Sequence, residues 1–337
     1  MSALGETAQK LVADHKGLLA TDATEESTNK RMEAVGIKPT AELRKQLREL
    51  LLTTDGFEKY VGGVILNDEI ICQKTSNNKS FPELLTEKNV LVGIKVDKKC
   101  HPLANFPGEK IAEGLDGLRD RLVEYKEMDV SFAKFRTVIV ISESIPTQIC
   151  LDSNAEVLGR YAALCQEAGI VPVVEPEVLM DGNHSLQRCE EVTRATLMST
   201  FKHLEDHKVN LSGMILKPNM VLPGKDSIEI VTIEEMVQST LDVLKRTVPS
   251  EVSGITFLSG GQGAEEATKR LNEMNKTGGL PWPLSFSFER ALEGPAMEVW
   301  QGKAENKGKA QVVFLHRCKM NYLARKGEYT AEAEKEI

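Results

Sequence analysis

Residues 154–175 read NAEVLGRYAALCQEAGIVPVVE, and this stretch contains the pattern that decides the fold. Residues 154–168 have the character of a helix, and Gly169 follows where a helix C-cap is expected. The run 170–175 is apolar at nearly every position, which is typical of a strand buried on both faces of a parallel sheet. A helix next to a buried strand is the repeating unit of α/β proteins.

Seven further runs of the same kind flank this unit. They are 17–22 (GLLATD), 62–66 (GGVIL), 91–96 (LVGIKV), 132–141 (FAKFRTVIVI), 213–217 (GMILK), 254–259 (GITFLS) and 284–288 (LSFSF). Their spacing leaves room for one crossover helix each time, and 40–52 and 234–246 have helical patterns. Eight such units predict a (β/α)8 TIM barrel. We expect one domain over residues 1–337, with a helical or tail segment from about residue 303.

A doubly wound sheet is the competing fold. It usually carries a glycine-rich first turn, but the first strand here runs into ATDATEES (20–27), which contains no GxGxxG motif. The barrel is therefore favoured.

Composition excludes several classes of protein. The 337 residues contain 42 Lys and Arg against 50 Asp and Glu, a net charge of −8, which argues against nucleic acid as the main partner. Hydrophobic residues make up 41%, enough for a sizeable core, and no apolar run approaches the roughly 18 residues of a membrane span. Six cysteines without a CxxC pair predict reduced thiols and a cytoplasmic protein.

Polar residues end most of the predicted strands, where barrel enzymes build their active sites. In chain order they are Asp22, Lys95, Lys134, Arg136, Glu175, Lys217, Ser259, Gly260, Ser287 and Arg290. One lysine in such a place can be a structural ion pair. Three are harder to explain by stability, because buried charges need partners and we expect too few carboxylates to pair them all.

Lys217 follows an apolar run in GMILKPN, where desolvation and like charge favour loss of its proton. A neutral amine can attack a carbonyl and form a Schiff base; the alternative is a lysine that caps a layer of the barrel. Glu175 in VVEPE is a candidate proton shuttle, and Glu177 would face the same way, so the pattern leaves the choice between them open. Asp22 is a second candidate base, or a helix cap.

Two groups of residues predict anion sites. The turn 258–263 (LSGGQG) precedes a helical segment, and Arg290 offers a forked donor that suits phosphate. Lys95, Lys134, Arg136 and Ser27 form a second group on the early strands. Two anion sites around a reactive lysine predict a bisphosphate substrate.

Metal chemistry is not expected. Only His203 and His207 share a helical face, in a charged segment without HExxH that is more typical of a solvated surface than of a zinc site. No dinucleotide or P-loop motif is present, so no cofactor is predicted.

The chain resembles the class I fructose-1,6-bisphosphate aldolases, the metal-independent Schiff-base family. The matching strings, in order, include GGVIL, VGIKVDK, FAKFR, GIVPVVEPEVL, DGNHSLQRC, LKPNMV, GITFLSGGQ and FSFERAL. The resemblance covers nearly the whole chain and implies cleavage of fructose 1,6-bisphosphate to dihydroxyacetone phosphate and glyceraldehyde 3-phosphate, in glycolysis or gluconeogenesis. It also implies a homotetramer and no cofactor.

The resemblance assigns roles to individual residues. It implies that Lys217 is the Schiff-base lysine, that Glu175 with its neighbour Glu177 shuttles protons, and that Asp22 handles the C4 hydroxyl proton. Lys134 and Arg136 would assist bond cleavage and contact substrate, and Lys95 would line the C6-phosphate side. Ser259, Gly260 and Arg290 would hold the C1 phosphate, with Ser287 a weaker candidate.

Three departures from the family pattern stand out. Glu25 and Glu26 add negative charge near the expected C6-phosphate site, which would favour another phosphoketose such as sedoheptulose bisphosphate or fructose 1-phosphate. Glu289 replaces a small residue beside Arg290. Tyr329 is the last tyrosine, which puts in doubt any step assigned to a terminal tyrosine. A non-catalytic scaffold that keeps the barrel is the alternative from a different class.

Overall fold

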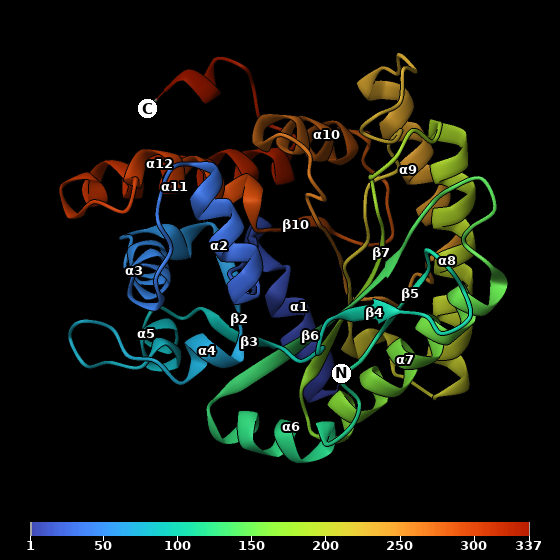
Figure 1. The fold of residues 1–337 in the computed structure, drawn as a ribbon, viewed down its shortest axis with the longest axis horizontal. Coiled ribbons are helices and arrows are strands. Elements are labelled where there is room, and N and C mark those ends of the chain that lie inside the picture. The colour runs from blue at the N-terminus through green and yellow to red at the C-terminus, as the bar shows by residue number, and fades with distance from the viewer. Residues whose placement is uncertain (1, 337) are drawn as a thin grey trace.

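A closed barrel of parallel strands forms the centre of the computed structural model, which describes residues 2–336 (Figure 1). The strands follow one another around the barrel in the order β1, β10, β9, β8, β7, β6, β3, β2. Their bounds are β1 Gly17–Ala20, β2 Val61–Leu66, β3 Leu91–Lys95, β6 Val130–Ile139, β7 Val171–Val178, β8 Ile215–Leu216, β9 Ile255–Phe257 and β10 Leu284–Phe288. The expectation of a (β/α)8 TIM barrel is therefore confirmed.

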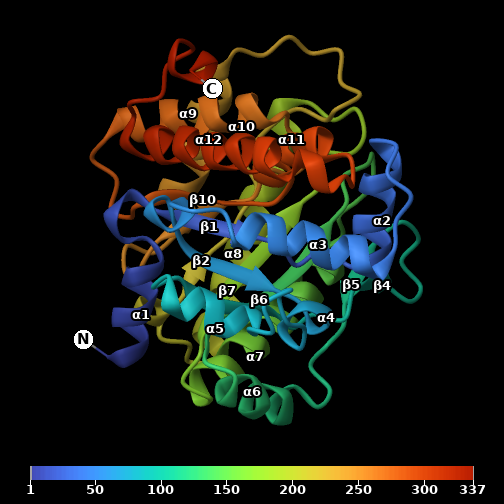
Figure 2. The same ribbon diagram turned by 90° about the vertical axis from the view of Figure 1, so that its left-hand side faces the viewer.

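Helices surround the barrel, and the last of them, α12, lies beside α3 (Figure 2). They are α1 Ala3–Leu11, α2 Glu25–Ala34, α3 Ala41–Leu52, α4 Asp68–Ile71, α5 Phe81–Glu87, α6 Leu118–Glu127, α7 Gln148–Glu167, α8 Leu186–Asp206, α9 Ile233–Thr247, α10 Ala264–Thr277, α11 Arg290–Trp300 and α12 Lys307–Lys326. Short 3₁₀ turns lie at Ala13–His15, Phe57–Lys59, Leu211–Gly213, Ala304–Asn306 and Ala333–Lys335. In both views α11 and α12 run beside the early helices, and α12 packs on α3.

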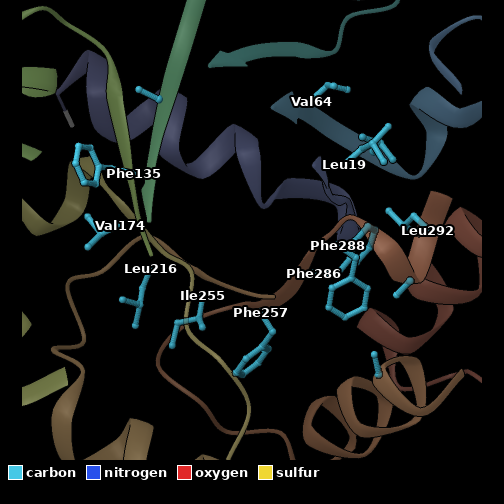
Figure 3. Packing of buried hydrophobic residues seen from close by; sticks show 14 of the residues in the cluster. Leu19, Val64, Phe135, Val174, Leu216, Ile255, Phe257, Phe286, Phe288 and Leu292 are labelled. Carbon is cyan, nitrogen blue, oxygen red and sulfur yellow. The ribbon is translucent and has the colours of Figure 1, made fainter. Parts of the chain in front are cut away.

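Alternate residues of each strand face opposite sides of the barrel wall. Leu19, Val64, Phe135, Val174 and Leu216 belong to a large cluster between the strands and the helices, to which the labelled residues of Figure 3 contribute. Their inward-facing neighbours form a second, smaller cluster inside the barrel, which includes Leu18, Ile65, Phe132, Val173 and Ile215. This alternation follows from the two-residue period of a strand. The same period fixes which later residues of each strand also point inward.

The amino-terminal end of the barrel is closed by α1. Ala8, Leu11 and Val12 belong to the inner cluster, and all three are buried. The helix approaches the strands so closely that a Cβ on Gly63 would lie 3.0 Å from Leu11 Cδ2. Side chains of α1 therefore complete the core at this end of the barrel.

Arg325 of α12 connects two chain segments at the same end of the barrel. Its guanidinium is buried and donates to the backbone carbonyls of Leu284, at the start of β10, and of Val12. Within residues 2–336 it forms no ion pair, and burial lowers its pKa to about 10. The arginine is therefore held by backbone dipoles that join the two ends of the chain.

Several elements differ in detail from the expectation. β8 contains only two residues, and α7 begins at Gln148, six residues before the segment 154–168. The hairpin of β4 (Cys100–Pro102) and β5 (Lys110–Ala112) was not expected, because its strands are short and partly exposed. No helix within the described residues is both long enough and apolar enough to cross a membrane.

Candidate active site

The carboxyl ends of the strands open into one cavity of ≈ 740 Å³. It is lined by all twelve residues predicted for the site: Asp22, Ser27, Lys95, Lys134, Arg136, Glu175, Glu177, Lys217, Ser259, Gly260, Ser287 and Arg290. Strand alternation explains the convergence. Lys134 is two residues beyond the inward-facing Phe132, Glu175 is two beyond Val173, and Lys217 is two beyond Ile215.

Four side chains form a continuous chain of contacts across the cavity. Lys217 Nζ lies 3.1 Å from Glu175 Oε1, and Lys134 Nζ lies 3.2 Å from Glu175 Oε2. Lys134 Nζ is also 2.6 Å from Asp22 Oδ2. All four are buried, so each ion pair acts in a medium that screens charge weakly.

The expectation that carboxylates are too few to pair the three lysines is wrong. Asp97 is the carboxylate that it overlooked: this buried side chain lies 2.9 Å from Lys95 Nζ and 4.0 Å from Lys134 Nζ. Its oxygens also accept hydrogen bonds from the backbone N–H groups of Lys99 and Arg136. The signal was present in the sequence, because Asp97 follows Lys95 by two residues, as Glu177 follows Glu175.

Charge pairing decides the protonation of Asp22. Burial opposes its ionisation, but the positive charges of Lys134, Lys217 and Lys95 outweigh burial and lower its pKa to about 2. Burial also opposes the charge on Lys134, yet Asp22, Glu175 and Asp97 raise the pKa of that ammonium. At neutral pH the pair is therefore an ionised carboxylate beside an ammonium.

Glu177 lies in a different environment from Asp22. Its buried Oε2 is 2.9 Å from Nη1 of the half-exposed Arg136. Burial raises the pKa of the Glu177 carboxyl and nearby Glu175 raises it further, while Arg136 opposes the shift. Within residues 2–336, Glu177 is not paired with a lysine, whereas Glu175 contacts both Lys217 and Lys134. The geometry thus distinguishes the two glutamates, which sequence reasoning left open.

Groups that could bind an anion lie close together where β9 and β10 end. Gly260 has φ +54°, a conformation that suits glycine, and a Cβ there would lie 2.8 Å from Leu258 Cδ1. A Cβ on Gly261 would lie 3.7 Å from both terminal nitrogens of Arg290, so the guanidinium sits over this turn. Ser287 Oγ is buried without a hydrogen-bond partner among the described residues. These donors can receive one phosphate.

The first turn of α2 also borders the cavity. Thr24, not Asp22, is the N-cap, because its side chain accepts from the backbone N–H of Ser27. Glu25 pairs with Arg44 at 3.0 Å, and Glu26 pairs with Lys30 at 2.8 Å. Each of the two extra glutamates therefore has a cationic partner on the protein, although Arg44 also pairs with Glu69 at 2.9 Å. Their effect on a C6 phosphate stays a prediction.

Glu289 and Tyr329 are the two other residues at which this chain departs from the family pattern. Glu289 turns to Arg31 of α2, a cavity residue that sequence reasoning missed. Tyr329 is buried, its N–H donates to Asn272, and it is not among the residues that line the cavity. Arg31 could have been found as the residue one helical turn after Ser27.

His203 and His207 do not lie on a fully solvated surface. His203 Nδ1 is 3.1 Å and His207 Nε2 is 2.8 Å from Glu156 Oε2 of α7, so the charged segment is partly buried against that helix. Across residues 2–336, no group of three or more His, Cys, Asp or Glu side chains is arranged to hold a metal ion.

The chain is similar to known proteins over nearly its whole length. The family model described as Glycolytic, fructose-bisphosphate aldolase class-I, matches residues 3–337. The "probable fructose-bisphosphate aldolase class 1" of Xanthomonas campestris pv. campestris is 49% identical over 97% of this chain and 98% of its own. Fructose-bisphosphate aldolase B of Gallus gallus is 44% identical over 98% of this chain and 92% of its own.

A solved structure is similar over nearly the whole fold. It is the fructose-bisphosphate aldolase of Plasmodium falciparum, in a ternary co-crystal with TRAP and a small-molecule inhibitor. The TM-score is 0.96 at 42% sequence identity, over 98% of this chain and 95% of that one.

Proposed function

Since the chain belongs to the family of class-I fructose-bisphosphate aldolases, which are lyases, we propose which of its residues carry out the cleavage of fructose 1,6-bisphosphate. Lys217 is the nucleophile. Its buried side chain lines the cavity, with a proton acceptor, Glu175, 3.1 Å from the amine. That contact is the observation that carries the proposal, because a Schiff-base lysine needs a group that removes its proton and later returns one.

The reaction proceeds through a covalent intermediate. Lys217 in its neutral form attacks the C2 carbonyl carbon, and Glu175 supplies the proton with which the carbinolamine loses water to form an iminium. The C3–C4 bond then breaks, and its electron pair moves into the iminium to give an enamine. Protonation at C3 and hydrolysis release dihydroxyacetone phosphate and restore the free lysine.

Asp22 and Lys134 act on the other half of the substrate. As C3–C4 breaks, the C4 hydroxyl loses its proton to Asp22 and becomes the aldehyde of glyceraldehyde 3-phosphate. The positive charge of Lys134, 2.6 Å from Asp22, keeps this carboxylate ionised and ready to accept the proton. Lys134 also contacts Glu175, so one ammonium balances both proton-transfer groups.

The two phosphates bind at opposite sides of the cavity. The turn at Ser259 and Gly260, with Ser287 and Arg290, receives the C1 phosphate. Ser27, Lys95 and Arg136 line the side that receives the C6 phosphate. Glu25 and Glu26 pair with Arg44 and Lys30, and another phosphoketose stays the alternative substrate.

Borohydride trapping tests the proposal directly. The full chain is incubated with dihydroxyacetone phosphate, reduced, digested and analysed by mass spectrometry, with Lys217→Arg as the matched variant. We expect one reduced adduct on the peptide that contains Lys217, and none in the variant. An adduct on Lys134 or Lys95 would overturn the assignment, and a folded chain without any adduct would favour a scaffold function. Full activity in excess EDTA is expected as well.

Three broader features belong to the same proposal. Residues 1–337 act as one domain, whose last part, from about residue 303, includes α12 packed on α3 and α10. The family's glycolytic character and the six free cysteines support a cytoplasmic location. The resemblance to the family supports a homotetramer, and light scattering coupled to size-exclusion chromatography should give four times 37.2 kDa.

A further inference from the structure

Glu289 is a carboxylate in a place that should receive a phosphate. It is the residue that precedes α11, and it lines the same cavity as Arg290, Ser287 and Arg31. Its side chain does not cap α11; instead Oε1 accepts from Arg31 Nη2 at 2.8 Å. The side chain of Glu289 is 27% exposed and that of Arg31 is 20% exposed, so both reach the cavity surface.

A second carboxylate also contacts Arg31 and shares its charge with Arg48. Glu293, one helical turn beyond Glu289, accepts from Arg31 Nη1 and lies 3.6 Å from Arg48 Nη1. Glu293 is fully buried and is not among the residues that line the cavity. Arg48 is anchored independently by hydrogen bonds to the Thr21 carbonyl and the Thr28 hydroxyl. The contact between α2 and α11 therefore persists without Glu289.

Glu289 supplies the second negative charge of a cluster that contains two arginines. Arg31 and Arg48 carry two positive charges, and Glu293 and Glu289 carry two negative ones. Without Glu289 the cluster would have one uncompensated positive charge, at Arg31 on the cavity wall. With Glu289 ionised, an incoming phosphate meets a second carboxylate instead of a guanidinium that only Glu293 contacts.

We propose that Glu289 determines how tightly the cavity holds a phosphate, because its carboxylate contacts Arg31 and keeps a negative charge in the cavity that contains the phosphate subsite. The inference rests on the proposed function, since it takes Ser259, Gly260, Ser287 and Arg290 as that subsite. Glu289 is a specificity-determining residue: it weakens the grip on any phosphate at this subsite and speeds the release of phosphorylated product. Burial and the nearby charges of Glu293 and Asp22 raise the pKa of Glu289, which fits a carboxylate retained at some cost.

Calorimetric titration with inorganic phosphate tests this without any need for catalysis. The chains are the parent, Glu289→Gln, which keeps the shape and an acceptor for Arg31, and Glu298→Gln as control. Glu298 is exposed on the same helix and does not line the cavity. We expect Kd to fall about tenfold for Glu289→Gln and to stay within about twofold for Glu298→Gln. KM for fructose 1,6-bisphosphate should fall with it.

Unchanged or weaker phosphate binding by folded Glu289→Gln would overturn the inference. Weaker binding together with a lower Tm would show that Glu289 only positions Arg31. If Glu289→Gln does not fold, Glu289→Ser removes the same charge in a smaller side chain, and the same tightening is expected. Failure of the proposed function is a separate result, the absence of a borohydride adduct on the parent chain.

Discussion

The two ends of the barrel are equally buried but differ in chemistry. At the amino-terminal end, Leu11 and Val12 fill the interior with apolar side chains. At the carboxyl end, Lys217, Glu175 and Lys134 fill it with charges that contact one another. Burial of apolar area stabilises the fold, whereas burial of ion pairs contributes little net stability once desolvation is counted. One end of the barrel therefore supports the fold, and the other end holds the residues proposed for the chemistry.

Replacement of Lys217 by methionine should have the largest effect on activity. We expect kcat to fall by about 10⁴-fold or more, because no other group can form the covalent intermediate. Stability should change by less than about 1 kcal/mol, since Glu175 keeps its ion pair with Lys134 at 3.2 Å. Steady-state kinetics and thermal unfolding of the same sample measure both. A loss of folding in parallel with activity would contradict the division of roles.

The second largest effect on activity is expected at Asp22, the proposed proton acceptor for the C4 hydroxyl. Asp22→Asn should lower kcat about 10³-fold, because the amide cannot take the C4 hydroxyl proton. Schiff-base formation at Lys217 should survive, so borohydride trapping with dihydroxyacetone phosphate should still label the lysine. If trapping disappears as well, Asp22 is needed earlier than proposed, and the assignment of the cleavage step to it is wrong.

A substitution at the amino-terminal end of the barrel should lower stability and leave activity nearly unchanged. Leu11→Ala removes a buried side chain from the inner cluster, and we expect a loss of about 3 kcal/mol in the free energy of unfolding. kcat should stay within about twofold of the parent at temperatures where the variant is folded. Urea unfolding and kinetics check the two parts. A large drop in kcat in the folded variant would show that the two ends are coupled.

The pH dependence of the free energy of unfolding gives a further test of the charged end of the barrel. The pKa of Asp22 is about 2 in the folded protein, against an ordinary value of 3.8. A lowered pKa stabilises the folded state at pH above the ordinary value, and this contribution is lost as pH falls from about 4 to about 2. It amounts to roughly 2 kcal/mol. Free energies of unfolding at pH 5, 4 and 3 should therefore fall more steeply for the parent than for Asp22→Asn, and equal slopes would refute the assignment.

Strand positions could be predicted from sequence because each buried run has a length and composition that few other structures share. The inward-facing site residues followed from the barrel and the two-residue period. The pairing among them could not be predicted, because it depends on register between strands: Arg136 lies opposite Glu175, and Lys95 lies opposite Lys134. Asp97 was missed although its spacing was visible.

Contacts between segments that are distant in the chain could not be predicted from the sequence for a related reason. Arg31 and Glu289 are 258 residues apart, and nothing local to either indicates the other. The closing role of α1 was missed because an amphipathic helix looks the same in sequence wherever its apolar face packs.

The pairing of β1 with β10, in which Leu18 lies opposite Ser287, joins the first strand of the chain to the last, so we expect it to determine when activity can begin during synthesis. A ribosome makes β1 almost first and β10 almost last, so the edge of β1 stays unpaired until most of the chain has emerged. Asp22 stands on one side of that seam and Arg290 on the other. A nascent chain that already contains Lys217 and Glu175 therefore still has an open barrel, and the newly made enzyme becomes active only when synthesis is nearly complete.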